Sequence, residues 1–497
     1  MSYLKKKSWR IVLMFAVGAF FLLWVGNPNP QDQRQPHSDA PTVSDLLHSY
    51  SADERANLPD DLMSYRDMGT IGVLFGDAEG LVGDGDMLTY FTNDEGAMMP
   101  VATRTDTEFL AYNGDTVAIE YLQAPDPVPG DSFFPEIYIN EITVAQDDDA
   151  QNGVFGNTRW MNIACRFGDM GDVTPRPIDY FESILVNEAP GMDDYWRTTS
   201  ADLVNIEGSH AYGWYDLPRS KAEYLRMAAV NTGNALQTLM NDCTQVVREA
   251  DGVDFSQFGG INMMLNDTFG CCAWGGRMTL RIDGQNMQFR TTWLPPWAFN
   301  SLHVIAHEMG HGWGLPHSSG PYGKVYDSAW DVMSGGNSNH TDAICRVGSE
   351  PLGCWQVGTI GFHLAMLGWI PEERMAVVPN GQSATIEIDP LTTLGTSDGT
   401  MVIFLPIGNS NRFYTVEARA FIDYDRNLPG EAVILHEVVP GRPSPAHVVD
   451  ADNNGNPNDE GAMWRVGETF EDRRNNIRVE VLENNGNTVT VRISNGG

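Results

Sequence analysis

The residues best suited to chemistry lie in one short segment, AFNSLHVIAHEMGHGWGLPH at positions 298–317. His307 and His311 are four residues apart, a spacing that places both imidazoles on one side of a helix, one turn apart. His317 follows and supplies a third imidazole. Three neutral imidazoles bind zinc and leave its fourth tetrahedral position open for water, as in catalytic sites. The segment therefore predicts a zinc site.

A carboxylate beside the first imidazole supplies the second part of this chemistry. Glu308 directly follows His307, so it points past the metal rather than toward it. Zinc lowers the pKa of bound water toward about 7, and a nearby carboxylate can then accept the proton. Glu308 is therefore the predicted general base. His303 lies one turn before His307 and is interpreted as a packing or supporting residue, because a fourth histidine would close the site.

The element that positions these residues is also predicted by the segment. Apolar residues recur at helical spacing: Leu302, Ile305, Ala306 and Met309. This stripe predicts a helix with one face in the core and with His307 and His311 on another face. Gly312 and Gly314 end the predicted helix, and Gly314 can adopt the positive φ that turns the chain toward His317.

The pattern H-E-x-x-H-x-x-G-x-x-H in this segment resembles the zinc signature of the metzincin metalloproteases. The segment YDSAWDVMSG at 326–335 resembles the Met-turn of that family. The resemblance implies that Met333 lies beneath the zinc as an apolar floor and is not a ligand. Some metzincins carry an oxyanion-stabilising tyrosine two residues after this methionine. That position is Gly335 here, so oxyanion stabilisation is unassigned beyond the zinc itself.

A narrower resemblance extends over residues 157–497. The sequence before the long predicted helix, LGWI at 367–370 and part of the C-terminal region are similar to the gametolysin-like and immune-inhibitor-A-like secreted peptidases. The two groups differ at the third metal ligand. His317 matches the gametolysin-like pattern, since immune-inhibitor-A-like members carry an aspartate there. The resemblance implies a secreted zinc peptidase with a metzincin-type α/β catalytic domain.

A second candidate metal site lies near the C-terminus. Its candidate calcium ligands are Asp450, Asp452 and Asn454. They begin the pattern D-x-[DN]-x-[DN]-G of a calcium-binding loop. The twelfth position should carry a bidentate acid, but it is Gly461, with Glu460 one place early. Either a calcium loop or an Asx-rich turn between strands accounts for these residues.

The chain divides into segments of different pattern. Residues 1–26 are predicted to be a signal peptide or a signal-anchor, and the polar residues 27–45 a linker. Residues 46–156 predict an N-terminal β-rich domain, either a structural module or a pro-region, without a cysteine to cap a metal. Residues 157–375 predict the α/β catalytic domain, and 376–497 an all-β, sandwich-like domain. The expected fold class is therefore multidomain α+β.

The N-terminal pattern predicts export from the cytoplasm. Basic residues at 5–7 and Arg10 precede sixteen uncharged residues at 11–26. Bulky Trp24 disfavours cleavage before the polar linker, and the apolar run is close to the lower length limit of a spanning helix. The protein is expected outside the cytoplasm, either secreted or attached to the membrane by this segment.

The charge of the chain limits its partners. Sixty-six acidic residues against 31 basic ones give a formal net charge of −35. Such a protein repels a phosphate backbone, which excludes the class of nucleic-acid-binding proteins. The expected partner is a protein or peptide substrate, with cationic peptides favoured over acidic ones. The sequence does not indicate an oligomeric state.

The six cysteines are an even number, as expected for disulfides in an oxidising compartment, and they lack C-x-x-C spacing. One expected bond joins Cys345 to Cys354. The other two are expected to link one pair of cysteines with another: Cys165 and Cys243 with Cys271 and Cys272. One or more free buried thiols is the alternative.

Two functions fit these patterns. The first is an exported zinc endopeptidase in which Glu308 activates water for attack on a peptide bond. The alternative is a non-catalytic surface adhesion or binding protein with a vestigial zinc site. Glu308 favours the enzyme, because a purely structural zinc has no need of that carboxylate.

Overall fold

The computed structural model of the protein describes these residues: 61–78, 86–103, 108–124, 136–146, 154–335 and 345–496, with Leu46, Tyr50, Arg55, Leu58 and Pro59. The predicted export segment, 1–26, and the predicted linker, 27–45, lie outside this part of the chain. Within it, no helix has the length and apolar character needed to cross a membrane.

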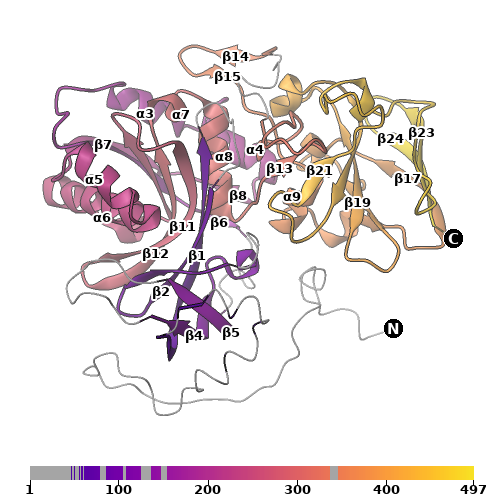
Figure 1. Ribbon diagram of the computed structural model, residues 1–497. Coiled ribbons are helices and arrows are strands. Elements are labelled where there is room, and N and C mark those ends of the chain that lie inside the picture. The colour runs from indigo at the N-terminus through magenta and orange to yellow at the C-terminus, as the bar shows by residue number, and fades with distance from the viewer. Residues whose placement is uncertain are drawn as a thin grey trace.

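One large sheet of ten strands runs through the N-terminal half of the described chain (Figure 1). Its order is β3-β2-β1-β11-β12-β10-β7-β9, with β4 paired to β1 and β5 paired to β4. The first strands are β1 Met63–Ala78, β2 Asp86–Asn93, β3 Met98–Pro100, β4 Thr116–Gln123 and β5 Ile137–Gln146. The later strands are β7 Trp160–Arg166, β9 His210–Asp216, β10 Gly260–Leu265, β11 Cys272–Ile282 and β12 Gln285–Leu294.

The predicted β-rich region joins this sheet through β1. β1 and β11 pair antiparallel, with Leu74 opposite Gly276 and Ala78 opposite Cys272. The second half of β1 is apolar and almost wholly buried, which explains why it enters the middle of the sheet. The sequence predicts strands in this region but not this pairing, which is separated by about two hundred residues along the chain.

Helices cover both faces of the sheet. They are α3 Ile178–Ile184, α4 Met192–Ser200, α5 Lys221–Ala228, α6 Thr232–Asp251, α7 Pro296–Phe299 and α8 Leu302–Trp313. A further helix, α9 Gly361–Met366, contacts β19 Phe413–Arg419 in the C-terminal region instead. Successive side chains of a strand point to opposite faces. Accordingly, Met161 and Ile163 of β7 share a core with α6, whereas Trp160 and Ala164 share a core with α8. The candidate site therefore lies on the α8 face.

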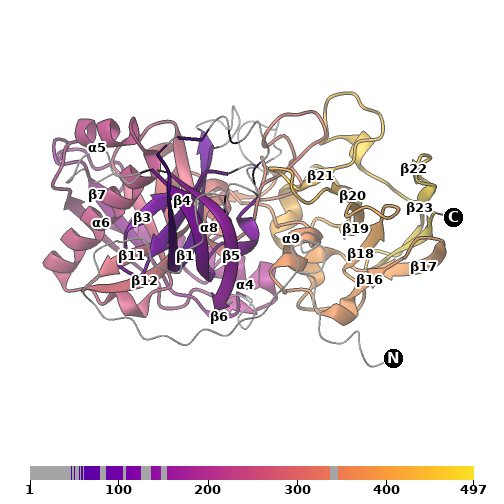
Figure 2. The same ribbon diagram turned by 60° about the horizontal axis from the view of Figure 1, so that its bottom comes forward.

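The C-terminal region contains two further sheets that share one apolar core. The six-stranded sheet comprises β13 Ser318–Ser319, β16 Met375–Val377, β18 Val402–Pro406, β19 Phe413–Arg419, β20 Ala432–Val438 and β21 Ala446–Val448. The four-stranded sheet comprises β17 Gln382–Ile388, β22 Thr469–Asp472, β23 Ile477–Asn484 and β24 Val489–Asn495. Figures 1 and 2 both show these strands on one side of the molecule and the ten-stranded sheet on the other. The predicted multidomain class with mixed helices and strands is confirmed.

Short elements connect the larger ones. Two-residue strands are β6 Gly156–Asn157, β8 Val204–Asn205, β14 Gly348–Ser349 and β15 Gly353–Cys354. The 3-10 helices are η3 Leu110–Tyr112, η4 Phe255–Gln257, η5 Glu372–Arg374, η6 Leu391–Thr393, η7 Asp423–Asn427 and η8 Glu460–Ala462. Strand β13 directly follows His317 and pairs with β21, so the C-terminal region supports the segment that carries the third histidine.

All six cysteines form disulfides. Cys345 pairs with Cys354, as predicted. The other predicted linkage is wrong: Cys165 of β7 pairs with Cys243 of α6, and the adjacent Cys271 and Cys272 pair with each other. Cys165 and Cys243 are both buried in the core between the sheet and α6, where the contact of α6 with β7 brings them together.

Candidate metal centre

Helix α8 carries two of the three predicted ligands and is buried on every side. The Ser301 side chain accepts a hydrogen bond from the Val304 amide at its beginning, and Gly314 ends it with a φ of 99°. The helix and its glycine end are therefore confirmed. The sequence predicts one buried face, whereas all faces of α8 are buried. β11, β1 and the loop around Met333 cover the remaining sides.

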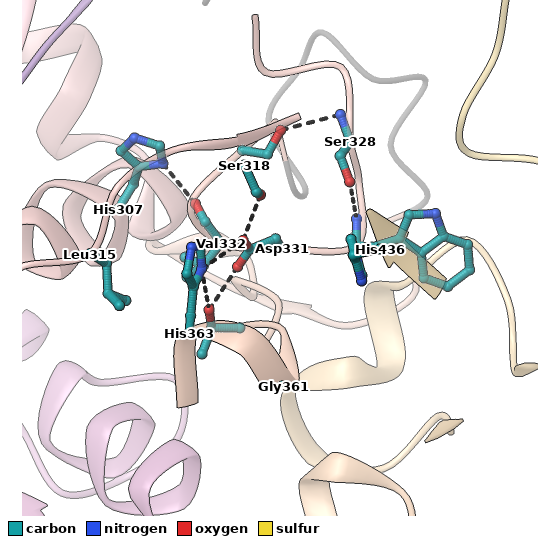
Figure 3. Close-up of polar contacts among 12 residues, drawn as sticks. His307, Leu315, Ser318, Ser328, Asp331, Val332, Gly361, His363 and His436 are labelled. Carbon is teal, nitrogen blue, oxygen red and sulfur yellow. Dashed lines mark hydrogen bonds and ion pairs between the residues drawn. The ribbon is translucent and has the colours of Figure 1, made fainter. Parts of the chain in front are cut away.

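The three predicted histidine ligands, His307, His311 and His317, form one cluster, called here the histidine cluster. Nε2 of His311 lies 3.1 Å from Nε2 of His307 and 3.0 Å from Nε2 of His317. The other ring nitrogens are used by the backbone. Nδ1 of His307 donates to the Val332 carbonyl at 2.7 Å (Figure 3), and Nδ1 of His311 donates to the Leu315 carbonyl at 2.7 Å. A carbonyl only accepts, so these bonds turn the Nε2 lone pairs toward the centre.

This donor set fits a metal ion. Tetrahedral nitrogen ligands about 2.05 Å from zinc lie roughly 3.3 Å from one another, close to the observed separations. Burial lowers the pKa of His311 to about 3 and also lowers the pKa of His317. Both rings are therefore neutral near pH 7, which is the form that binds metal. Converging lone pairs at this distance repel one another unless a cation lies between them.

Glu308 lies beside the histidine cluster and is fully buried. Neither of its carboxylate oxygens has a hydrogen-bond partner among the described residues. Burial, with a further contribution from the Asp77 carboxylate, raises the pKa of Glu308 well above its ordinary value. Room for the carboxylate comes from Gly275 of β11, where a Cβ would lie 2.7 Å from Oε2 of Glu308. A buried, unpaired carboxylate needs a partner, and a metal-bound water would supply one.

Met333 is fully buried beneath α8. A Cβ placed on Gly310 would lie 2.3 Å from its sulfur, so the thioether packs directly against the helix that carries the ligands. The Ser318 amide donates to the Met333 carbonyl at 2.9 Å. The turn that contains Met333 is thereby joined to the segment that follows His317. Nε2 of His303 donates to the Ser334 carbonyl at 3.0 Å, and burial lowers the pKa of His303 to about 4.

A buried carboxylate that the sequence did not single out holds these segments together. Asp331 accepts hydrogen bonds from the hydroxyls of Ser318, at 2.5 Å, and Thr359, at 2.8 Å. Its other close neighbour is Nδ1 of His363, at 3.0 Å (Figure 3). Burial alone would raise the pKa of Asp331, but His363 and the two hydroxyls lower it. Asp331 thus fixes the residue after His317 and directly precedes Val332, which orients His307.

A second carboxylate missed in the sequence lies within the histidine cluster itself. Asp77 is the next-to-last residue of β1 and is fully buried. Its Oδ2 lies 3.0 Å from Nε2 of His307, and its Oδ1 lies 3.0 Å from Nε2 of His317. Asp77 and the three histidines together form a group that could hold a metal ion. The only signal in the sequence was an aspartate after an apolar run, which is also how a turn begins.

The hydroxyl of Tyr326 also lies beside the histidine cluster. Tyr326 donates to Oδ1 of Asp77, and its oxygen lies 3.4 Å from Nε2 of His317. The sequence left the oxyanion-stabilising group unassigned because Gly335 occupies the position expected from the resemblance. Tyr326 lies seven residues before Met333 instead of two after it.

The candidate calcium residues are brought together only in part. Asp450 and Asp452 group with Asp459, not with Glu460. The Asn454 amide nitrogen donates to Asp452 at 2.9 Å and to Asp459 at 2.8 Å, so this predicted ligand pairs with the acids. Side-chain oxygens also accept from backbone amides two residues ahead along the loop, as in an Asx-rich turn. These contacts fit an Asx-rich turn, and the three carboxylates are also close enough to hold a metal ion, so both interpretations of this segment remain predictions.

No protein-family model, curated protein or solved structure matches this chain.

Proposed function

We propose that the protein is a zinc-dependent endopeptidase. The observation that supports this most is the combination of three converging Nε2 atoms with the buried, unpaired carboxylate of Glu308 beside them. Three imidazoles and one open position are typical of a catalytic zinc, which supplies a water of lowered pKa and polarises a carbonyl. A purely structural zinc site needs no adjacent base.

The residues around the metal each have a defined task in this proposal. The carbonyls of Val332 and Leu315 fix the His307 and His311 rings with Nε2 inward. Glu308 accepts the proton of the attacking water at its carboxylate and returns it to the leaving amine nitrogen when the peptide C–N bond breaks.

We also assign Tyr326 as the donor to the oxyanion that forms on the substrate carbonyl. Its hydroxyl already donates to a carboxylate oxygen, Oδ1 of Asp77, at the centre of the histidine cluster. A carbonyl oxygen that became negatively charged at that position would accept the same bond. Preorganised donors of this kind contribute strongly to acyl-transfer reactions.

Export from the cytoplasm remains part of the proposal. The three disulfides are consistent with an oxidising compartment, where such bonds persist. The acidic composition agrees with a preference for cationic protein or peptide substrates over acidic ones. The protein is proposed to work as a secreted enzyme or while attached to the membrane through residues 1–26.

The alternative is an adhesion or binding protein with a vestigial metal. The two functions are separated by following metal content and hydrolysis together. The purified chain is depleted of metal with a chelator, reloaded with zinc, and incubated with denatured casein and with a lysine-rich peptide. The proposal expects one zinc per chain and hydrolysis that disappears on depletion and returns on reloading. Zinc binding without hydrolysis in the wild-type chain and in the variants Asp77→Ala and Asp77→Asn would favour the adhesion protein.

A further inference from the structure

The last residues of β1 pair with β11, the strand that lies against the helix carrying His307 and His311. β11 pairs with β12 on one side, and on the other side Leu74–Ala78 cover its backbone from Gly276 to Cys272. Without β1, this part of β11 would be an open sheet edge, a surface to which an extended peptide adds by backbone hydrogen bonds. Gly275 of the same strand lies against Glu308. A peptide bound along β11 would therefore pass the proposed general base.

Side chains of the covering segment fit closely over the histidine cluster. The Phe75 ring stacks on the His311 ring with centroids 4.1 Å apart and planes 8° apart, and it meets the His317 ring edge-on at 5.5 Å. Gly76 separates Phe75 from Asp77, and a Cβ there would lie 2.6 Å from the Trp274 ring. The segment thus lies against both the ligands and β11, with no space between them for a side chain at position 76.

The contacts of Asp77 indicate a metal ligand. Nε2 of His311 has a lone pair, because Nδ1 carries the proton given to Leu315, and it lies 3.5 Å from Oδ2 of Asp77. A proton on Nε2 of His307 would satisfy Oδ2, but Nε2 of His311 would still need a donor or a cation of its own. One cation at the centre satisfies the carboxylate and all three imidazoles together. A carboxylate oxygen is an ordinary zinc ligand at about 2.0–2.2 Å.

We propose that Asp77 is a fourth protein ligand of the metal and that Leu74–Ala78 occupy the place of the substrate strand on β11. This inference rests on the proposed function. It names β11 as the strand that receives an extended peptide substrate, and Leu74–Ala78 as the segment that blocks it. Asp77 takes the metal position that water needs, and Phe75 covers the rings. The activity of the protease is therefore low while β1 is paired with β11, and displacement of β1 opens the site.

The test compares the full chain with Asp77→Ala and Asp77→Asn. Asp61→Ala is the matched control, because Asp61 is exposed and lies just before β1. Each protein is loaded with Co²⁺ in place of zinc, and metal content, visible absorption and thermal unfolding are measured. Both Asp77 variants should bind one metal per chain with an altered absorption spectrum, since one oxygen ligand has changed. Asp61→Ala should match the wild type. Identical spectra for all four proteins would overturn the ligand assignment.

Hydrolysis by the zinc-loaded proteins tests whether Leu74–Ala78 block the substrate strand's place on β11. Removing a ligand that competes with water and substrate should raise the rate on a peptide roughly tenfold or more, because the competent fraction rises. Equal hydrolysis by wild type and both Asp77 variants would overturn the block by Leu74–Ala78 and leave the proposed function standing. Altered spectra without hydrolysis in any protein would instead contradict the proposed function and leave the ligand assignment standing.

Discussion

Ser318, the residue after the third histidine, donates its hydroxyl to Asp331 across 2.5 Å, and Asp331 lies two residues before Met333. This contact joins the segment that carries His317 to the turn beneath the cluster. Both residues are fully buried, so the bond is not weakened by competition with water. The ligand geometry thus depends on residues that do not touch the metal position.

Replacing Asp331 with Asn should weaken metal binding. The change removes the charge that faces His363 and weakens the acceptor for Ser318 and Thr359. Loss of such a supporting contact typically lowers metal affinity by about 10–100-fold. Zinc affinity measured by competition with a chelator at fixed pH checks this. Thr359→Val, which removes one of the three contacts, should give a smaller loss, and an unchanged affinity in Asp331→Asn would contradict the positioning role.

Gly275→Ala should reduce hydrolysis while leaving the metal in place. A Cβ at this position would lie 2.4 Å from the Glu308 carbonyl oxygen and 2.7 Å from Oε2, so both the backbone and the carboxylate of Glu308 must shift. A displacement of about 1 Å in a reacting group can cost about a hundredfold in rate. Gly171→Ala is the matched control, because its nearest neighbour would be 3.6 Å away. Equal rates for both alanine variants would count against Glu308 as the base.

Tyr326→Phe should lower kcat more than it changes KM. The hydroxyl is proposed to bind the oxyanion and not the ground-state carbonyl, so its loss acts on the transition state. Removing one such donor typically costs about 10²–10³ in kcat. Tyr322→Phe removes a hydroxyl that bonds to Asp450, away from the cluster, and should have little effect. If the two variants behaved alike, another group would have to stabilise the oxyanion.

Because His436 is buried, the free energy of unfolding of the protein should decrease as the pH falls below neutral. Burial lowers the pKa of His436 to about 3, whereas the unfolded value is about 6.5. Between these values the unfolded chain binds a proton that the folded chain excludes, so stability falls as pH decreases below about 6.5, by up to about 1.4 kcal/mol per pH unit for this group.

This pH effect is measured on metal-free protein, so that metal loss does not contribute. Denaturant unfolding at pH 7 and pH 5 should show a smaller acid loss in His436→Gln than in the wild type. His210→Gln replaces an exposed histidine and should retain the wild-type loss. A wild-type-like loss in His436→Gln would show that other groups carry the acid sensitivity.

Much of the candidate site could be predicted from the sequence because it is local. His307, Glu308 and His311 lie within five residues of one helix, so helical spacing alone places their side chains. The glycine that ends the helix was visible for the same reason. The disulfide between Cys345 and Cys354 closes a short loop and was also predicted.

The rest depends on contacts between distant segments. Asp77 reaches the histidine cluster because β1 pairs with β11, and strand pairing across about two hundred residues leaves no periodic signal in either strand. Asp331 lies in the segment that resembles the Met-turn, and its partner His363 comes from α9. The Cys165–Cys243 bond was missed because it requires α6 to cover β7.

Glu308 is proposed to act as the base at a metal-bound water. Glu308→Gln is compared with Glu460→Gln, which changes an exposed glutamate near the C-terminus. Both are made in the full chain and in the Asp77→Ala background. The account predicts equal zinc content in all proteins and a loss of about 10²–10⁴-fold in kcat for Glu308→Gln alone. Hydrolysis that survives Glu308→Gln unchanged in both backgrounds would contradict it.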